Sequence, residues 1–173
     1  MSPILPTRRY TRAMSHTFLF ADLCGFTEYT FRHGDELAAE LALAFHQRVR
    51  ELAGEEGCDV VKPIGDAVMV RADDCHDALR LARRVVALSV SEGYPPIRVG
   101  VDVGSAVEHQ GDWYGSTVNT AARVTDAASP GELVVTERAH AAIAEGVNVQ
   151  LLARGVWQLK GLPEMRVHAA AIV

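Results

Sequence analysis

Short apolar runs alternate along the chain with longer segments in which apolar residues recur every three or four positions. The run 17–21, Thr-Phe-Leu-Phe-Ala, is typical of a buried strand. The segment 35–54 repeats leucine, phenylalanine and valine at helical spacing, which predicts a long helix capped by Asp35. A second amphipathic helix is predicted over 77–92. This alternation predicts one α/β or α+β domain.

Between these two helices, the stretch 60–70 has the pattern of strand, tight turn and strand. Pro63 presets φ and Gly65 tolerates a positive φ, so the turn is expected between them. Lys62 and Asp66 lie at the mouth of this hairpin. The two charges are either ordinary solvated turn residues or part of a polar binding site.

The second half of the chain continues the alternation of strands and helices. A half-buried strand is predicted over 97–104, with 105–109 as its antiparallel neighbour and a glycine-bounded loop at 111–115. A helix near 116–128 carries Asn119 and Arg123, which share one face because they are four residues apart.

The C-terminal part is predicted to add further strands to the same domain. We expect a strand over 133–136, a helix over 137–145 and at least two strands within 149–172, with a turn that contains Lys160. No internal repeat is visible, so the catalytic or binding part of the chain is predicted as one domain, 16–173. Residues 1–15 have no periodicity and are expected to form an N-terminal tail that can be disordered.

Composition narrows the possible partners and the compartment. The chain has 173 residues, of which 49% are hydrophobic, and a net charge of −5, so it has no general attraction to nucleic acid or to an anionic membrane. Cys24, Cys58 and Cys75 are odd in number and lack zinc-site spacing. Together with the absence of a long apolar run, this predicts a cytoplasmic protein without nucleic-acid or membrane partners. The seven histidines show no ligand spacing and are interpreted as surface or core residues.

One further pattern suggests phosphate chemistry. Asp22 ends the first predicted strand, and Gly25 follows where a helix can begin. The free backbone amides at a helix N-terminus can hold phosphate oxygens.

Four segments in this order resemble the catalytic domain of class III nucleotidyl cyclases, most closely that of a stand-alone bacterial adenylyl cyclase. The segments are 20–27 (FADLCGFT), 62–69 (KPIGDAVM), 112–123 (DWYGSTVNTAAR) and 159–162 (LKGL). Each is a weak match alone, but the four in register are highly specific. The resemblance implies a ferredoxin-like βαββαβ core with C-terminal strand additions, an α+β fold arranged as an α/β sandwich. It also implies a head-to-tail homodimer with shared active sites.

The resemblance further assigns the metal and phosphate groups. Asp22 and Asp66 are similar to the family's metal carboxylates, which bind two divalent ions, Mg²⁺ or Mn²⁺, with the Leu23 carbonyl as a further ligand. The backbone amides of Cys24, Gly25, Phe26 and Thr27 would cradle the β and γ phosphates, helped by Lys160 of the other subunit.

The remaining family positions concern the ribose, the transition state and the base. Asn119 would orient the ribose and Arg123 would stabilise the transition state. Lys62 and Asp112 match the pair that reads adenine, which implies ATP as substrate and 3′,5′-cyclic AMP with pyrophosphate as products. Two alternatives remain: a guanylyl cyclase, and a catalytically silent cyclase-like module that binds nucleotides and acts by heterodimerisation.

Overall fold

The computed structural model describes residues 14–143 and 149–170. Most of the predicted N-terminal tail therefore lies outside the described residues, and the boundary at residue 16 stays a prediction. Within the described part, no helix is both long enough and apolar enough to cross a membrane.

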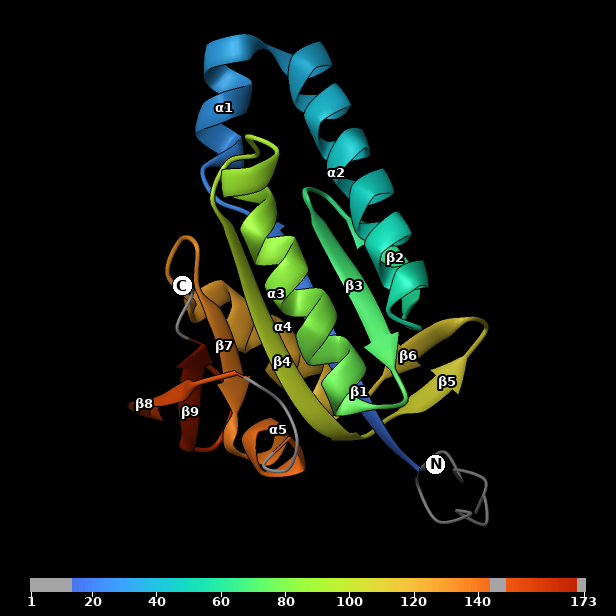
Figure 1. Ribbon diagram of the computed structural model, residues 1–173, viewed down its shortest axis with the longest axis vertical. Coiled ribbons are helices and arrows are strands. Elements are labelled where there is room, and N and C mark those ends of the chain that lie inside the picture. Colours follow the sequence, from blue (N-terminus) through green and yellow to red (C-terminus); the bar gives the residue numbers. More distant parts are fainter. Residues whose placement is uncertain (1–13, 144–148, 171–173) are drawn as a thin grey trace, which may run out of the picture.

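A seven-stranded sheet forms the centre of the structure (Figure 1). Its strands follow the order β2-β3-β1-β4-β7-β9-β8. The elements of its first half are β1 (Ser15–Leu23), α1 (Phe26–His33), α2 (Asp35–Glu55), β2 (Asp59–Ile64), β3 (Ala67–Ala72), α3 (Cys75–Ser91) and β4 (Ile97–Ser105). Those of the second half are β5 (Val107–His109), β6 (Asp112–Tyr114), α4 (Ser116–Ala127), β7 (Leu133–Thr136), α5 (Glu137–Ala142), β8 (Leu151–Trp157) and β9 (Met165–Ala170).

The strand order confirms the predicted fold class. In the first half, β1 lies between β3 and β4 and is antiparallel to both, while β2 pairs with β3 at the edge. This is the order and direction of a ferredoxin-like βαββαβ core, with α1 and α2 in the first crossover and α3 in the second. Strands β7, β9 and β8 extend the sheet beyond β4, as the predicted C-terminal additions do.

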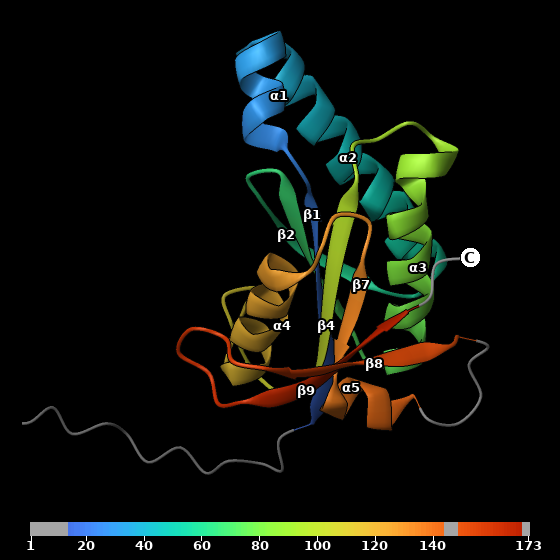
Figure 2. The same cartoon turned by 90° about the vertical axis from the view of Figure 1, so that its left-hand side faces the viewer.

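Helices cover both faces of the sheet (Figure 2). Helices α2 and α3 pack on one face, and α4 packs on the other. Strand β1 is buried on both sides, because Leu19 belongs to the α2/α3 cluster whereas Phe18 and Phe20 belong to the α4 cluster. This explains why its sequence is an unbroken apolar run rather than an alternating one.

Gly100 permits the close packing of α4 on β4. A Cβ at this position would lie 2.4 Å from Thr125 Oγ1 and 2.9 Å from the Ala121 carbonyl oxygen, so any side chain would displace the helix. Thr125 Oγ1 donates a hydrogen bond to the Ala121 carbonyl at 2.8 Å. The position of α4, and with it the direction of Asn119 and Arg123, depends on this glycine.

Several predicted element boundaries were wrong. Residues 107–109 do not pair with β4; they form a separate two-stranded sheet with Asp112–Tyr114, which had been expected to be a loop. The turn between these strands has positive φ at Gln110 and Gly111, a backbone conformation that a tight hairpin requires. Helix α3 begins at Cys75 rather than Asp77, because Asp74 accepts a hydrogen bond from the His76 amide. Helix α2 is capped by Gly34, and Asp35 is its first residue.

Candidate active site

The ends of β1, β4 and the β2–β3 hairpin bring two aspartates and an arginine together. Asp22 pairs with Ala67 of β3 on one side and with Arg98 of β4 on the other. Asp66 immediately precedes Ala67, in a turn where Gly65 has a φ of 59°, as predicted for this glycine. The register of β1 therefore places the Asp66 carboxylate beside Asp22.

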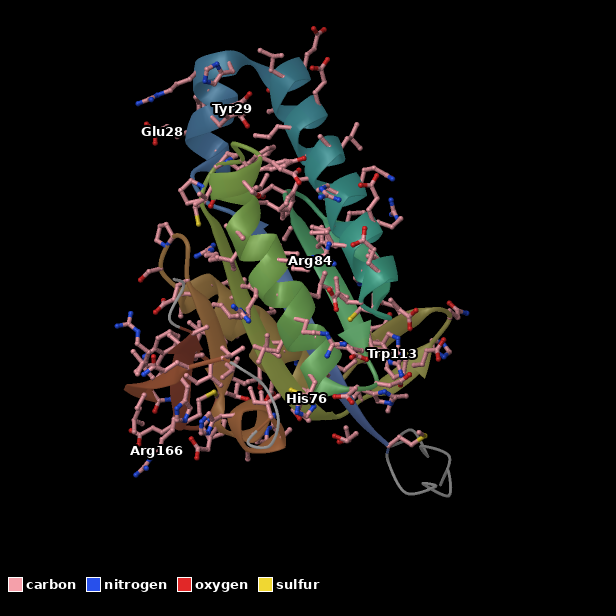
Figure 3. The ribbon with its side chains drawn as sticks, in the orientation of Figure 1. Glu28, Tyr29, His76, Arg84, Trp113 and Arg166 are labelled. Atoms are coloured by element: carbon pink, nitrogen blue, oxygen red, sulfur yellow. The ribbon has the colours of Figure 1, made fainter. Side chains whose placement is uncertain are left out.

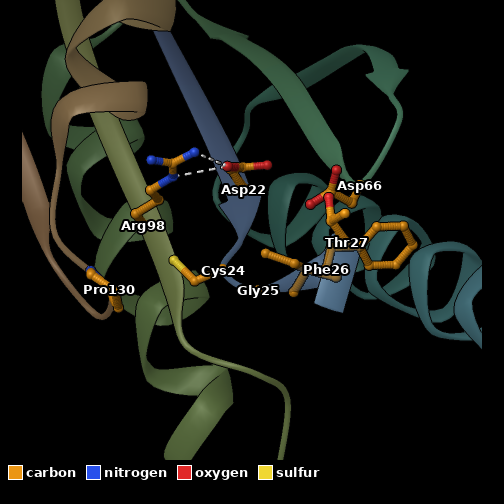
Figure 4. A pocket seen from close by; sticks show the side chains of 9 residues that line it. Asp22, Cys24, Gly25, Phe26, Thr27, Asp66, Arg98 and Pro130 are labelled. Atoms are coloured by element: carbon orange, nitrogen blue, oxygen red, sulfur yellow. Dashed lines mark hydrogen bonds and ion pairs between the residues drawn. The ribbon is translucent and has the colours of Figure 1, made fainter. Parts of the chain in front are cut away.

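These residues line a cavity of about 410 Å³ (Figure 4). Its lining contains Asp22, Leu23, Cys24, Gly25, Phe26, Thr27, Asp66, Arg98 and Pro130. In Figure 4 the Asp66 and Thr27 side chains lie on one side of Asp22, and Arg98 lies on the other. The seven residues that the sequence assigned to metal and to backbone phosphate contacts thus meet in one pocket, which we call the carboxylate pocket.

The charges in the carboxylate pocket favour a cation. Burial and the nearby Asp22 carboxylate raise the pKa of Asp66 to about 6. Arg98 Nε and Nη2 donate to Asp22 Oδ2 at 2.8 and 2.7 Å, which offsets only part of the negative charge. Two carboxylates and a backbone carbonyl are hard oxygen donors, and such a set fits Mg²⁺ or Mn²⁺.

The N-terminus of α1 opens into the same pocket. Gly25 caps the helix with a φ of 72°, a conformation that favours glycine, and the first amides of a helix have no partner within it. One predicted phosphate contact was wrong: the Cys24 amide already donates to the Pro96 carbonyl at 2.8 Å. The amides that follow Cys24 remain candidates. Burial raises the pKa of the Cys24 thiol, so the thiol stays protonated at neutral pH.

Lys62 and Asp112 form an ion pair outside the carboxylate pocket, although 50 residues separate them in the sequence. Asp112 Oδ1 also accepts a hydrogen bond from the Trp113 amide at 2.8 Å, which fixes the carboxylate. The hydrogen bond from Lys62 and that from Trp113 lower the pKa of Asp112, which therefore stays ionised.

Trp113 supports this ion pair through packing. Its ring lies 4.5 Å from the His16 ring and 5.7 Å from the Phe18 ring, centroid to centroid, and the Arg71 guanidinium lies over it at 4.8 Å. Figure 3 shows Trp113 at the end of the sheet beside the small β5–β6 sheet. It anchors β6, and β6 carries Asp112.

The other predicted residues are exposed and lie outside the carboxylate pocket. Asn119 and Arg123 are on the outer side of α4, and Lys160 is in the turn between β8 and β9. The Arg123 side chain is 51% exposed, and its ion pair with Asp126 spans 3.9 Å. Within one chain, the predicted site residues therefore lie in three separate places: the carboxylate pocket, the Lys62–Asp112 pair, and the exposed surface of α4 and the β8–β9 turn.

Sequence reasoning missed Arg98 and Pro130 in the pocket. Arg98 lies in a half-buried strand, and only the pairing of β4 with β1 shows that it faces Asp22. Pro130 belongs to the stop signal after α4, a pattern that carries no chemical information. Arg98 is a charged residue at the start of a largely buried strand, and this unusual position was the one sign in the sequence that it could have a role in a site.

Comparison with known proteins decides the family. The model of the adenylate and guanylate cyclase catalytic domain matches residues 9–170. The chain belongs to this family. An adenylate cyclase of Streptomyces griseus is 38% identical over 123 residues, which cover 70% of this chain and 31% of that protein. A pH-sensitive adenylate cyclase of Mycobacterium tuberculosis is 36% identical over 133 residues, 75% of this chain and 32% of that protein.

The family's fold is also found in solved structures. A Trypanosoma brucei adenylate cyclase, described in its monomeric state, superposes with a TM-score of 0.81 at 21% identity over 99% of this chain and 93% of that chain. At this identity the similarity establishes the fold of the cyclase domain and nothing finer. The chain spans about a third of the length of the two bacterial relatives, so its own activity has to be argued from its residues.

Proposed function

We propose that this cyclase domain is an adenylyl cyclase that converts ATP to 3′,5′-cyclic AMP and pyrophosphate at two sites shared by a homodimer. The observation that carries the proposal is the meeting of Asp22 and Asp66 in one pocket, at the N-terminus of α1. The bacterial relatives named adenylate cyclase support the same reaction.

In this proposal the carboxylate pocket holds the metal ions and the triphosphate. Asp22, Asp66 and the Leu23 carbonyl would bind two divalent ions. When bound, these ions lower the pKa of the ribose 3′-hydroxyl and neutralise the triphosphate. The first amides of α1 and the Arg98 guanidinium would bind phosphate oxygens. The 3′-oxygen would attack the α-phosphorus in line, and pyrophosphate would leave.

The exposed residues complete the site from the other subunit. Asn119 would orient the ribose, Arg123 would stabilise charge that develops on the α-phosphoryl oxygens, and Lys160 would bind the β and γ phosphates. A head-to-tail dimer explains why these three side chains are exposed on one chain, away from the carboxylates that they would assist.

The Lys62–Asp112 pair favours ATP over GTP. Lysine can donate to adenine N1, and aspartate can accept from the N6 amino group. Guanine presents a donor at N1 and an acceptor at O6, which places like polarity against both side chains. The ion pair would keep the Lys62 ammonium and the Asp112 carboxylate close together, so that both can contact the same edge of the base.

Assays of cyclic-nucleotide formation test the proposal. Purified protein with Mn²⁺ or Mg²⁺ is given ATP or GTP, and the products are separated by chromatography. We expect cyclic AMP from ATP, reduced at least about 1,000-fold in Asp66→Ala, since a metal ion contributes several kcal/mol to such a reaction. Asp59→Ala, on the exposed part of the same hairpin, is the matched control and should keep full activity.

The alternatives give different results. Formation of cyclic GMP from GTP in preference to cyclic AMP from ATP would identify a guanylyl cyclase. Nucleotide binding without product from either substrate would identify a silent module and refute the proposal.

A further inference from the structure

Three side chains with metal-binding atoms meet far from the carboxylate pocket. Glu137 and His140 come from α5, and His168 comes from β9. In Figure 1, α5 lies at the end of the sheet opposite to α1, whose N-terminus opens into the pocket. None of the three residues lines the carboxylate pocket, and none belongs to the predicted catalytic residues.

The fold brings these residues together through one strand pair. Strand β7 runs directly into α5, so Glu137 is the first residue of the helix, and His140 follows one turn later on the same side. Val135 of β7 is the register partner of His168 in β9. The His168 ring is thereby placed next to Glu137 at the start of α5, which sequence spacing could not reveal because the two residues are 31 positions apart.

Their geometry is compact. His168 Nε2 lies 2.6 Å from Glu137 Oε2, and the His140 and His168 rings are stacked with centroids 3.9 Å apart and an interplanar angle of 7°. One ligand atom from each residue lies within 4.8 Å of the other two. The His168 side chain is only 13% exposed, whereas Glu137 is 54% exposed and leaves the cluster open to solvent.

We propose that Glu137, His140 and His168 form a second metal site, which binds a divalent transition-metal ion of the zinc type. Two imidazoles and one carboxylate are a ligand set that Zn²⁺, Co²⁺ and Ni²⁺ accept, with water in a further position. Stacked rings do not both aim at one point, so the two imidazoles rotate about their side-chain torsions when the ion binds. The site differs in kind from the carboxylate pocket, whose donors are all oxygen.

The surrounding charges leave the Glu137 carboxylate ionised and able to bind a metal ion. The hydrogen bond from His168 is the largest of the influences that lower the pKa of Glu137, and His140 and Arg166 add to it, so this carboxylate is ionised at neutral pH. Arg138, the neighbouring cation, is directed to the fully buried Asp102. Figure 3 shows Arg166 at the outer side of β9, projecting away from the molecule.

Zinc titration of the full chain, prepared without a histidine tag, tests this site. A chromophoric chelator of known affinity competes for Zn²⁺, in the wild type and in a variant with both Asp22→Ala and Asp66→Ala. We expect one Zn²⁺ per chain to remain bound in the double variant. His168→Gln or His140→Gln in that background should weaken binding by more than about 100-fold, since even the loss of a residue behind a metal ligand costs up to that factor.

A matched control separates this site from general histidine binding. His109→Gln changes an exposed histidine on β5, outside the cluster, and should leave Zn²⁺ affinity unchanged. Zn²⁺ should also raise the thermal midpoint of the double variant but not that of its His168→Gln derivative, because an ion would link α5 to β9 and bind only the folded chain. Circular dichroism spectra check that each variant folds.

Two results would overturn the proposal. If the Asp22→Ala/Asp66→Ala variant retains no Zn²⁺, the cluster is a hydrogen-bonded Glu–His pair beside a stacked histidine and not a metal site. If Zn²⁺ stays bound after both histidine substitutions, the ion is held elsewhere, for example by a free cysteine thiol. Neither result depends on cyclase activity, so the proposed reaction and this site are tested separately.

Discussion

The carboxylate pocket and the outer side of α4 differ in how firmly their side chains are held. In the pocket, Asp22 receives two hydrogen bonds from Arg98, and the β1 register fixes the position of Asp66. On α4, Asn119 is exposed and Arg123 reaches only a 3.9 Å ion pair. We expect this difference if the pocket binds metal within one chain and the α4 residues acquire their contacts only when a dimer assembles.

On α4, the largest effect should come from Arg123. Arg123→Ala is expected to lower turnover by about two to three orders of magnitude with little change in fold, because the side chain is exposed and would act on transition-state charge. Steady-state kinetics measure the loss. Arg83→Ala, an exposed arginine of α3, is the control and should have wild-type turnover.

Mixing Arg123→Ala with Asp22→Ala tests whether the carboxylate pocket and α4 serve the same active site from different subunits. If the two regions serve different subunits, each mixed dimer retains one intact site, and equal amounts should recover about a quarter of wild-type activity by random pairing. The assay is cyclic AMP formation after mixing and equilibration. No recovery, despite heterodimers shown by differently tagged chains, would mean that one subunit supplies both regions.

A more moderate effect is expected from the Lys62–Asp112 pair. Lys62→Glu replaces a donor by an acceptor beside Asp112, so the preference for ATP over GTP should fall by at least about tenfold. The ratio of kcat/KM for the two nucleotides measures this change. The Mn²⁺ concentration for half-maximal activity should stay the same, and a large shift in it would show that base reading and metal binding are not separate.

The smallest expected effect is on the pH dependence of stability, through His46 of α2, which lies beside Gly65 in the β2–β3 turn. Burial lowers the pKa of His46 on α2, while the Gly65 backbone opposes this shift, so the folded protein favours the neutral ring. The unfolded chain takes up a proton as pH falls through about 6.5, and the folded chain does so only at lower pH. The contribution of His46 to stability is therefore constant above about pH 6.5 and is lost as pH falls below it.

Urea denaturation at pH 7.5 and pH 5.5 checks this dependence. Acidification from pH 7.5 to pH 5.5 should shift the midpoint further downward in the wild type than in His46→Gln. Equal differences in the two proteins would assign the acid sensitivity to groups other than His46.

Much of the fold could be predicted because its elements bury their side chains in regular ways. The helical spacing of α2 follows from packing on one face of the sheet, and the apolar run of β1 follows from burial on both faces. The errors fell where local patterns are ambiguous: the short strands β5 and β6 pair with one another in a separate two-stranded sheet, and neither contributes a long apolar run. The first residue of a helix depends on a single capping side chain, such as Asp74 before α3, and the apolar pattern does not show it.

The sequence alone determined the family resemblance and the residue types that it requires, since its motifs are local strings around turns and helix starts. Only the tertiary structure decided which of these residues meet. The register of β1 between β3 and β4 brought Arg98 to Asp22, and that of β7 with β9 brought His168 to Glu137. Strand pairing joins residues that are distant in the chain, and a shift of one position would turn each side chain to the opposite face of the sheet.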